Sequence, residues 1–149
     1  MRAVVQRVSR CAVRPAGEAP RSQGAGLLLY VGVERGDGES DAAYIADKTA
    51  GLRIFLDDDG KMNRSVAQAG GAITVVSQFT LAGDVRRGRR PSFTQAEDPD
   101  RANQLYERLV CLLRAAGLPV NTGVFRASMQ VESCNEGPVT ILLDSRRTF

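Results

Sequence analysis

The stretch Gly26-Leu27-Leu28-Leu29-Tyr30-Val31-Gly32-Val33 is an almost wholly apolar run within a chain of 149 residues. A cluster of turn-forming residues at positions 35–38 closes the run. A short apolar run that ends in turn residues is typical of a strand whose two faces are both covered. We therefore expect a fully buried strand here.

Other runs rich in Val, Ile and Leu predict further strands, at residues 2–8, 52–56, 73–79, 129–132 and 139–144. Clusters of Gly, Pro, Asp and Arg separate these runs and predict turns between them. The pattern of short strands and turns is typical of a mainly antiparallel sheet.

Two amphipathic helices accompany the strands. The clearer helix begins with Asp98 as its N-cap and Pro99 in its first turn, and Gly117 ends it. Its apolar face comprises Ala102, Leu105, Leu109, Leu112 and Ala116. A weaker stripe starts near Ser40 and comprises Ala42, Ile45, Ala46, Thr49 and Leu52. We predict an α+β fold with mainly antiparallel, barrel-like β-sheet layers and about two flanking α-helices.

The length and composition suit a single domain spanning residues 1–149. Hydrophobic residues make up 43% and charged residues 25% of the chain, as in ordinary globular proteins. Residues 1–10 lack the apolar core of a signal peptide, and no apolar run has membrane-spanning length, so we expect a cytoplasmic protein. The few, scattered cysteines argue against disulfides and favour roles as small core residues. They are Cys11, Cys111 and Cys134.

The chain contains no histidine. This absence removes Ser-His-Asp and Cys-His catalytic systems and every histidine-ligated zinc site. No compact cluster of Asp, Glu and Cys stands in their place, so we expect neither a metal nor another cofactor. The formal net charge of +3 is only mildly basic, so contacts with a polyanion should be local and DNA is not an expected partner.

Residues 75–81, Val-Val-Ser-Gln-Phe-Thr-Leu, begin as a buried strand and then place polar groups where that strand should end. Active sites often occupy such positions. Ser77, Gln78 and Thr80 are candidates for holding a carbonyl oxygen or a water. Thr80 would be a nucleophile only if another group accepted its proton, and an ordinary strand end is the alternative interpretation.

Residues 135–140, Asn-Glu-Gly-Pro-Val-Thr, form a second distinctive segment. Gly137 has the freest backbone, and Pro138 fixes its own φ while lacking an amide hydrogen. The pair predicts a tight turn with a rigid loop tip. Because cis peptides occur mainly before proline, the pair is also a candidate for presenting main-chain carbonyls in a fixed direction.

A basic run follows the first segment, in a loop completed by Pro91-Ser92-Phe93. Arginines near a strand end favour contact with a nucleic-acid backbone, although a solvated charge run is the alternative. The run comprises Arg86, Arg87, Arg89 and Arg90. Phe125 and Arg126 are candidates for stacking on or pairing with a terminal nucleotide, and burial in the core is an equally open role for Phe125.

The segments at 77–81 and 135–140, with their separation, resemble those of the D-aminoacyl-tRNA deacylase family. Similarity extends along nearly the whole chain. It includes Gln6-Arg7-Val8, Gly60-Lys61-Met62-Asn63, Arg89-Arg90-Pro91-Ser92-Phe93 and residues 122–129.

The resemblance implies a carboxylic ester hydrolase that proofreads translation by releasing D-amino acids from tRNA, with glycine mischarged on tRNA-Ala as a further substrate. It implies a homodimer in which Gly137 and Pro138, joined by a cis peptide, enter the partner subunit's active site and exclude L-amino acids. It also implies that the aminoacylated adenosine lies along residues 77–81, with Phe79 and Thr80 near the ester and Phe125 near the base.

The catalytic candidates are therefore Ser77, Gln78, Phe79 and Thr80. The substrate-binding candidates are Gly137, Pro138, Phe125, Ala127, Met129 and Asn135. The four arginines of the basic run are the tRNA-binding candidates. For the chemistry, we favour attack by water, helped by the ribose 2′-hydroxyl of the tRNA, with the backbone amide of Phe79 or Thr80 stabilising the oxyanion.

Arg126 departs from the resemblance, because the family more usually has a small residue at this position. Ser133 and Cys134 also replace more apolar residues, and we expect them to affect only packing. One alternative is a sister editing enzyme that removes L-alanine from tRNA, which carries a different strand-end motif. The others are a non-catalytic RNA-binding module or structural dimer, and a metal-dependent hydrolase.

Overall fold

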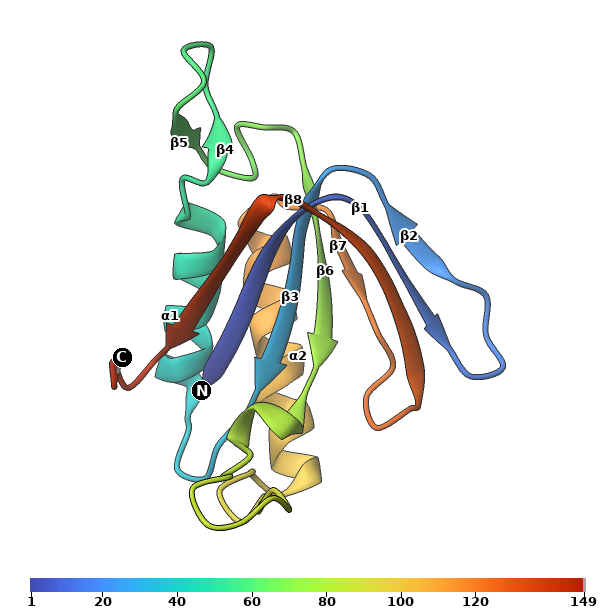
Figure 1. Cartoon of the computed structure of the whole chain (residues 1–149), viewed down its shortest axis with the longest axis vertical. Coiled ribbons are helices and arrows are strands. Elements are labelled where there is room, and N and C mark those ends of the chain that lie inside the picture. Colours follow the sequence, from blue (N-terminus) through green and yellow to red (C-terminus); the bar gives the residue numbers. More distant parts are fainter. Residues whose placement is uncertain (149) are drawn as a thin grey trace.

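The computed structural model describes residues 1–148 as a mixed β-sheet with two α-helices (Figure 1). The sheet consists of β1 (Arg2–Pro15), β2 (Arg21–Gln23), β3 (Gly26–Gly32), β6 (Ala72–Ser77), β7 (Val120–Thr122) and β8 (Met129–Asp144). A separate small hairpin consists of β4 (Phe55–Leu56) and β5 (Met62–Arg64). The helices are α1 (Glu39–Gly51) and α2 (Pro99–Ala115), and a 3-10 turn, η1 (Phe79–Ala82), follows β6.

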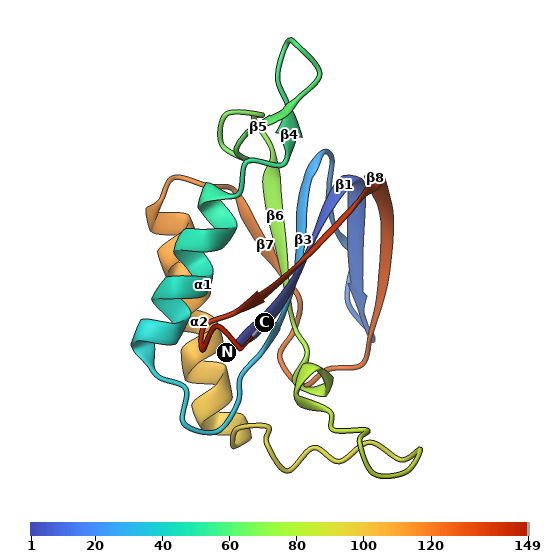
Figure 2. The ribbon, with the colours of Figure 1, turned by 60° about the vertical axis from the view of Figure 1, so that its left-hand side comes forward.

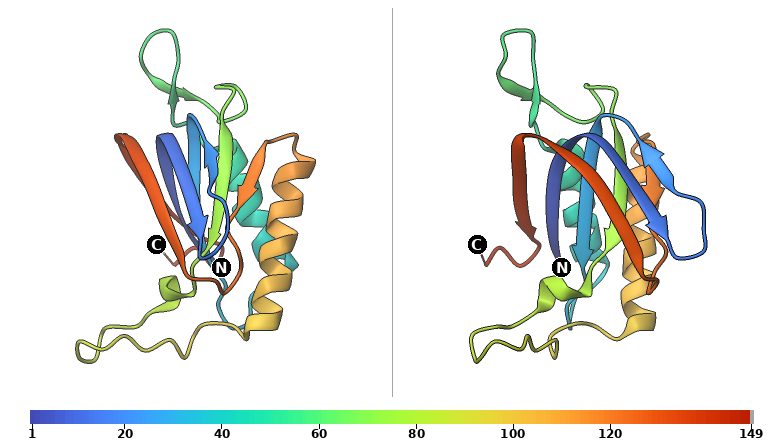
Figure 3. Two further views of the ribbon diagram at one scale, coloured as in Figure 1. Left: turned by 90° about the vertical axis from the view of Figure 1, so that its right-hand side faces the viewer. Right: turned by 45° about the vertical axis from the view of Figure 1, so that its right-hand side comes forward.

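The sheet combines antiparallel and parallel pairs. Its order is β2-β1-β3-β6-β7, and β8 pairs with β1. β1 runs antiparallel to β2, β3 and β8, whereas β6 runs parallel to β3 and β7. The connections through α1 and α2 are long enough to return the chain for these parallel pairs. Figure 3 shows the long strands β1 and β8 curving together, which gives the sheet its barrel-like form.

The predicted α+β, barrel-like fold with two helices is confirmed. The structure also contains parallel strand pairs, which the sequence does not predict. Figure 2 shows that both helices cover the same face of the sheet. β3 is buried on both faces, as expected for its apolar run. Leu27 and Leu29 pack into the core under the helices, whereas Leu28 packs on the opposite side. That second cluster comprises Val8, Cys11, Val13, Leu28 and Val76.

The helices begin close to where the sequence predicts. The Asp98 side chain caps α2 by accepting a hydrogen bond from the Asp100 amide at 3.1 Å. Ala116 was expected on the buried face but is exposed, because α2 ends one residue earlier. The expectation that all three cysteines are core residues is wrong for Cys111, which is exposed on α2, whereas Cys11 is buried. No helix among residues 1–148 is both long and apolar enough to cross a membrane.

The observed strands differ from the expected ones. β1 continues past residue 8 to Pro15, and the short strands β2, β5 and β7 are not predicted by the sequence. The run at 52–56 forms only β4, and the run at 73–79 ends at Ser77, where η1 follows. The two predicted strands at 129–132 and 139–144 are parts of one strand, β8. Gly137 and Pro138 are therefore not the tip of a turn between strands. They lie within β8 in a bulge, which accommodates the irregular backbone and the missing amide hydrogen while pairing continues on both sides.

Candidate active site

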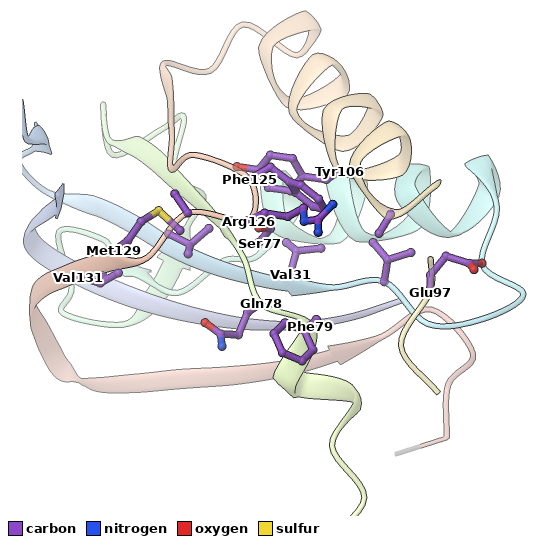
Figure 4. Close-up of a pocket in the computed structure, with 14 residues that line it drawn as sticks. Val31, Ser77, Gln78, Phe79, Glu97, Tyr106, Phe125, Arg126, Met129 and Val131 are labelled. Carbon is purple, nitrogen blue, oxygen red and sulfur yellow. The ribbon is translucent and has the colours of Figure 1, made fainter. Parts of the chain in front are cut away.

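An open pocket lies at the end of β6 (Figure 4). Its volume of about 300 Å³ suits a small organic ligand or one nucleoside unit. The walls come from β3, the end of β6, α2 and the segment that leads into β8. The lining residues are Val31, Val33, Val76, Ser77, Gln78, Phe79, Glu97, Ala102, Tyr106, Phe125, Arg126, Ala127, Met129 and Val131.

The pocket brings together two of the sequence segments that carry predicted site residues. From the ten catalytic and substrate-binding candidates it contains Ser77, Gln78, Phe79, Phe125, Ala127 and Met129. It does not contain Thr80, Asn135, Gly137 or Pro138 of the same chain, nor any arginine of the basic run. Sequence reasoning missed Glu97 and Tyr106, because one precedes α2 and the other lies on its apolar face, and neither belongs to a motif.

The turn after β6 leaves two backbone amides available. The Gln78 amide donates to the Val31 carbonyl at 2.7 Å, and the Leu81 amide donates to the Gln78 carbonyl at 3.2 Å. Among residues 1–148, neither the Phe79 amide nor the Thr80 amide donates a hydrogen bond. Two adjacent unused donors at a pocket edge can stabilise a negatively charged oxygen.

The side chains of the same turn are fixed by local contacts. Gln78 Nε2 donates to the hydroxyl of Thr80, and Thr80 is not one of the residues that line the pocket. Phe79 is 59% exposed, and the Phe93 ring meets the Phe79 ring edge to face, with 5.0 Å between the ring centres. Phe93 thereby links the pocket rim to the loop that carries the basic run.

Tyr106 and Phe125 form the aromatic wall of the pocket. The Tyr106 hydroxyl donates to the Val75 carbonyl at 2.9 Å, and burial raises the pKa of this phenol to about 12. It therefore stays protonated at neutral pH. Phe125 lies 6.0 Å from the Tyr106 ring, lines the pocket and packs against the core, so its expected core role is found, and its contact with a terminal nucleotide stays a prediction.

The segment 123–129 turns sharply beneath this wall. The Ala127 amide donates to the Val124 carbonyl at 3.2 Å, and Arg126 between them has a φ of 63°. Gly123 is required where the segment meets Met129, because a Cβ there would lie 2.7 Å from the Met129 sulfur. The turn places Phe125, Arg126 and Ala127 in one continuous stretch of pocket wall.

The buried side chain of Arg7 stabilises the bulge in β8. Gln6 pairs with Thr140 and Val8 with Asn135, so Arg7 faces residues 136–139. Arg7 is 7% exposed, and its guanidinium donates to the Glu136 carbonyl at 3.0 Å and to the Ile54 carbonyl.

The Gly137 to Pro138 peptide of this bulge is cis, and both residues are exposed. Gly137 has a φ of 131°, and a Cβ there would lie 2.7 Å from Val139 Cγ2. Asn135 does not reach the pocket; its Oδ1 accepts from the Val139 amide at 2.8 Å and closes the bulge.

The basic run lies on an exposed loop. Mutual backbone hydrogen bonds of 2.8 and 2.9 Å between Asp84 and Ser92 close this loop. Arg86 pairs with Asp84 at 2.6 Å, and hydrogen bonds from Arg86 lower the pKa of the Asp84 carboxyl to about 2. Within residues 1–148, the three other arginines of the run form no ion pair. They are available for an external anion.

These features define a class of protein. A nucleoside-sized pocket with an aromatic wall, small polar groups at a strand end and two free amides suits an enzyme that acts on a nucleotide-linked substrate. In the described part of the chain, no three His, Cys, Asp or Glu side chains are grouped as a metal site requires. The absence of a metal remains a prediction.

Comparison with known proteins identifies the family. A family model described as D-Tyr-tRNA(Tyr) deacylase matches residues 4–144. The chain is 61% identical to a D-aminoacyl-tRNA deacylase of Anaeromyxobacter dehalogenans over 149 residues, covering 100% of both chains. It is 57% identical to that of Symbiobacterium thermophilum, covering 100% of this chain and 99% of the relative. The chain therefore belongs to the D-aminoacyl-tRNA deacylase family, and the expectation of a hydrolase of this family is confirmed.

Two solved structures share this fold. A c-Myc DNA unwinding element binding protein superposes with a TM-score of 0.90 at 36% identity, covering 97% of this chain and 98% of that one. A probable eukaryotic D-amino acid tRNA deacylase superposes with a TM-score of 0.80 at 19% identity, covering 95% and 97%. The second likeness supports the fold alone.

Proposed function

We propose that this chain hydrolyses the ester bond of D-aminoacyl-tRNA in the pocket at the end of β6, releasing free D-amino acid and tRNA. One observation carries the proposal: the pocket joins Ser77, Gln78 and Phe79 to Phe125 and Met129, which are distant in the sequence. The aromatic wall offers a stacking surface for the terminal adenine. The ester then lies toward the strand end.

The proposed chemistry relies on the backbone. The amides of Phe79 and Thr80 stabilise the oxyanion that forms when water attacks the ester, and the ribose 2′-hydroxyl of the tRNA assists the attack. The Tyr106 phenol is unsuited to be the base, because its pKa is raised to about 12 by burial. The Thr80 hydroxyl is engaged by Gln78 and lies outside the pocket lining, which favours water over Thr80 as the nucleophile.

The proposed stereochemical filter comes from a second subunit. Gly137 and Pro138 are exposed and do not line the pocket of their own chain, which leaves them accessible to the pocket of another copy. In the proposed homodimer, their main-chain atoms occupy the space that the side chain of an L-amino acid would need. Backbone atoms can reject every L-amino acid in the same way. They contact the groups around Cα, whose arrangement is common to all L-amino acids. Glycine has no side chain to exclude, so tRNA-Ala mischarged with glycine is a further substrate.

The test is single-turnover release of amino acid from matched D-tyrosyl-tRNA and L-tyrosyl-tRNA, with chelator present and a no-enzyme control. Selective cleavage of the D-ester is expected. Thr80→Ala should retain most of this activity, because only its backbone amide is used. Loss of turnover in Thr80→Ala, with tRNA still bound and an acyl-enzyme trapped in the parent chain, would identify Thr80 as the nucleophile instead.

The same assay separates the alternative functions. Preferential cleavage of L-alanyl-tRNA would indicate the sister editing activity, although the Ser77-Gln78-Phe79-Thr80 segment argues for the D-specific enzyme. Binding of tRNA without cleavage of either ester would indicate an RNA-binding module. Loss of cleavage with chelator would indicate a metal-dependent hydrolase.

A further inference from the structure

Arg126 contributes a charge to the pocket that the proposed mechanism does not use. Figure 4 shows its side chain beside Phe125 and Tyr106, within the set of residues that line the pocket. The other charged lining residue is Glu97, whose Oε1 accepts a hydrogen bond from the Asp98 amide at 2.8 Å. Among residues 1–148, the Arg126 guanidinium forms neither an ion pair nor a hydrogen bond. It is therefore a cation without a protein partner at a ligand site.

The backbone at Arg126 adds a second, independent observation. Its φ of 63° lies in the left-handed region, which residues with a Cβ adopt reluctantly and glycine adopts freely. A bulky residue in such a conformation at a pocket points to a use for its side chain. The neighbouring contacts hold the backbone at this position, because Phe125 packs on Tyr106 and the Ala127 amide closes the turn onto Val124.

We propose that Arg126 binds the phosphodiester on the 5′ side of the terminal adenosine and thereby holds the end of the tRNA in the pocket. This inference rests on the proposed deacylase function. An arginine guanidinium matches a phosphate through paired N–H donors. In the proposed placement the adenine lies against Phe125 and the ester lies near Phe79, and the anionic group of that nucleotide is its 5′ phosphate. It belongs at the edge of the aromatic wall where Arg126 stands.

The variant Arg126→Met tests the charge. Methionine keeps a Cβ and an unbranched stem, so the left-handed backbone remains equally disfavoured while the cation is lost. Arg126→Lys is the rescue variant, because it keeps the charge. Arg53→Met is the matched control, since Arg53 donates to the Asn63 carbonyl beside the β4-β5 hairpin, at the end of the molecule away from η1.

The experiment measures single-turnover kcat/KM on D-tyrosyl-tRNA and D-aspartyl-tRNA at several salt concentrations. Loss of one charged hydrogen-bond contact should lower kcat/KM about 10- to 100-fold on both substrates in Arg126→Met. The slope of log kcat/KM against log salt should also become less steep by about 0.7, the value for one single-strand phosphate. Arg126→Lys should retain the parent slope, and Arg53→Met should match the parent chain throughout.

Each other outcome overturns a specific step. A loss confined to D-aspartyl-tRNA would assign Arg126 to a carboxylate of the amino acid rather than to a phosphate. A lower rate with an unchanged salt slope would show a purely steric role. Parent-like values in Arg126→Met would overturn the inference while the deacylase function stands. Failure of the parent chain to cleave either D-ester would instead overturn the proposed function itself.

Discussion

The α-ammonium group of Met1 lies 2.7 Å from Oδ1 of Asp37, and neither side chain is exposed. The same ammonium donates to the Ser145 hydroxyl at 2.7 Å, and Arg146 reaches the same Asp37 oxygen at 2.9 Å. The chain start is thereby tied to the turn before α1 and to the end of β8. Asp37 is therefore a buried carboxylate that two cations share.

Asp37→Asn should therefore destabilise the protein. The neutral amide leaves the Met1 ammonium and Arg146 without their shared carboxylate. Breaking a buried ion pair costs about 3 to 5 kcal/mol, and the free energy of unfolding should fall by this order. Urea unfolding measures the change. Asp47→Asn, on the exposed side of α1, is the control; equal stability of the Asp37→Asn and parent chains would contradict the structural role of this carboxylate.

Arg7→Lys should loosen the bulge that carries Gly137 and Pro138. Lysine cannot donate simultaneously to the Glu136 and Ile54 carbonyls as the Arg7 fork does. A loss of about 1 to 3 kcal/mol in stability is expected from the unsatisfied buried carbonyl. If the bulge excludes L-substrates, the D-to-L ratio of single-turnover rates should also fall, by roughly tenfold for each 1.36 kcal/mol of lost discrimination. Arg10→Lys in the same strand is the control, and an unchanged ratio would limit Arg7 to a stabilising role.

The sequence predicts the elements of this molecule better than their connections. The apolar run of β3 and the Asp98 cap of α2 are local signals, and both are found as expected. The parallel pairing of β3 with β6 depends on contacts between distant residues, which no local pattern encodes. The bulge at Gly137 was read as a turn for the same reason, since only the pairing with β1 on both sides reveals one continuous strand.

The candidate active site shows the same difference between local signals and contacts between distant residues. Ser77 and Phe79, which lie within one motif, line the pocket, whereas Asn135 closes its own bulge; the catalytic roles of Ser77 and Phe79 stay predictions. Tyr106 was missed because a pocket-lining residue on a helix has the same periodicity as a core residue. Its position beside the pocket depends on how α2 packs against β6, which is again a contact between distant parts of the chain.

The Asp84 carboxyl should titrate with a pKa of about 2, below its ordinary value of 3.8. Hydrogen bonds from the Arg86 side chain and amide favour the charged form, so the pairing is complete above pH 3.8 and is lost as the pH falls through 2. An NMR titration of the carboxyl carbon measures this value. Arg86→Ala should return the pKa part of the way to 3.8, because the backbone amide remains. An Asp84 pKa of 3.8 in the parent chain would show that the Arg86 pair does not persist in solution.

Arg126→Gly should raise the free energy of unfolding and lower the rate of ester cleavage. A residue with a Cβ costs about 1 to 2 kcal/mol in the left-handed region, and glycine removes this cost. The greater freedom of glycine in the unfolded chain offsets roughly 0.5 to 1 kcal/mol, so the free energy of unfolding should rise by about 0.5 to 1 kcal/mol. Urea unfolding measures the gain, and Arg10→Gly within β1 should show the opposite sign. A less stable Arg126→Gly protein would mean that contacts of the Arg126 side chain outweigh its backbone cost; a more stable but slower one would show that the arginine is kept for the substrate.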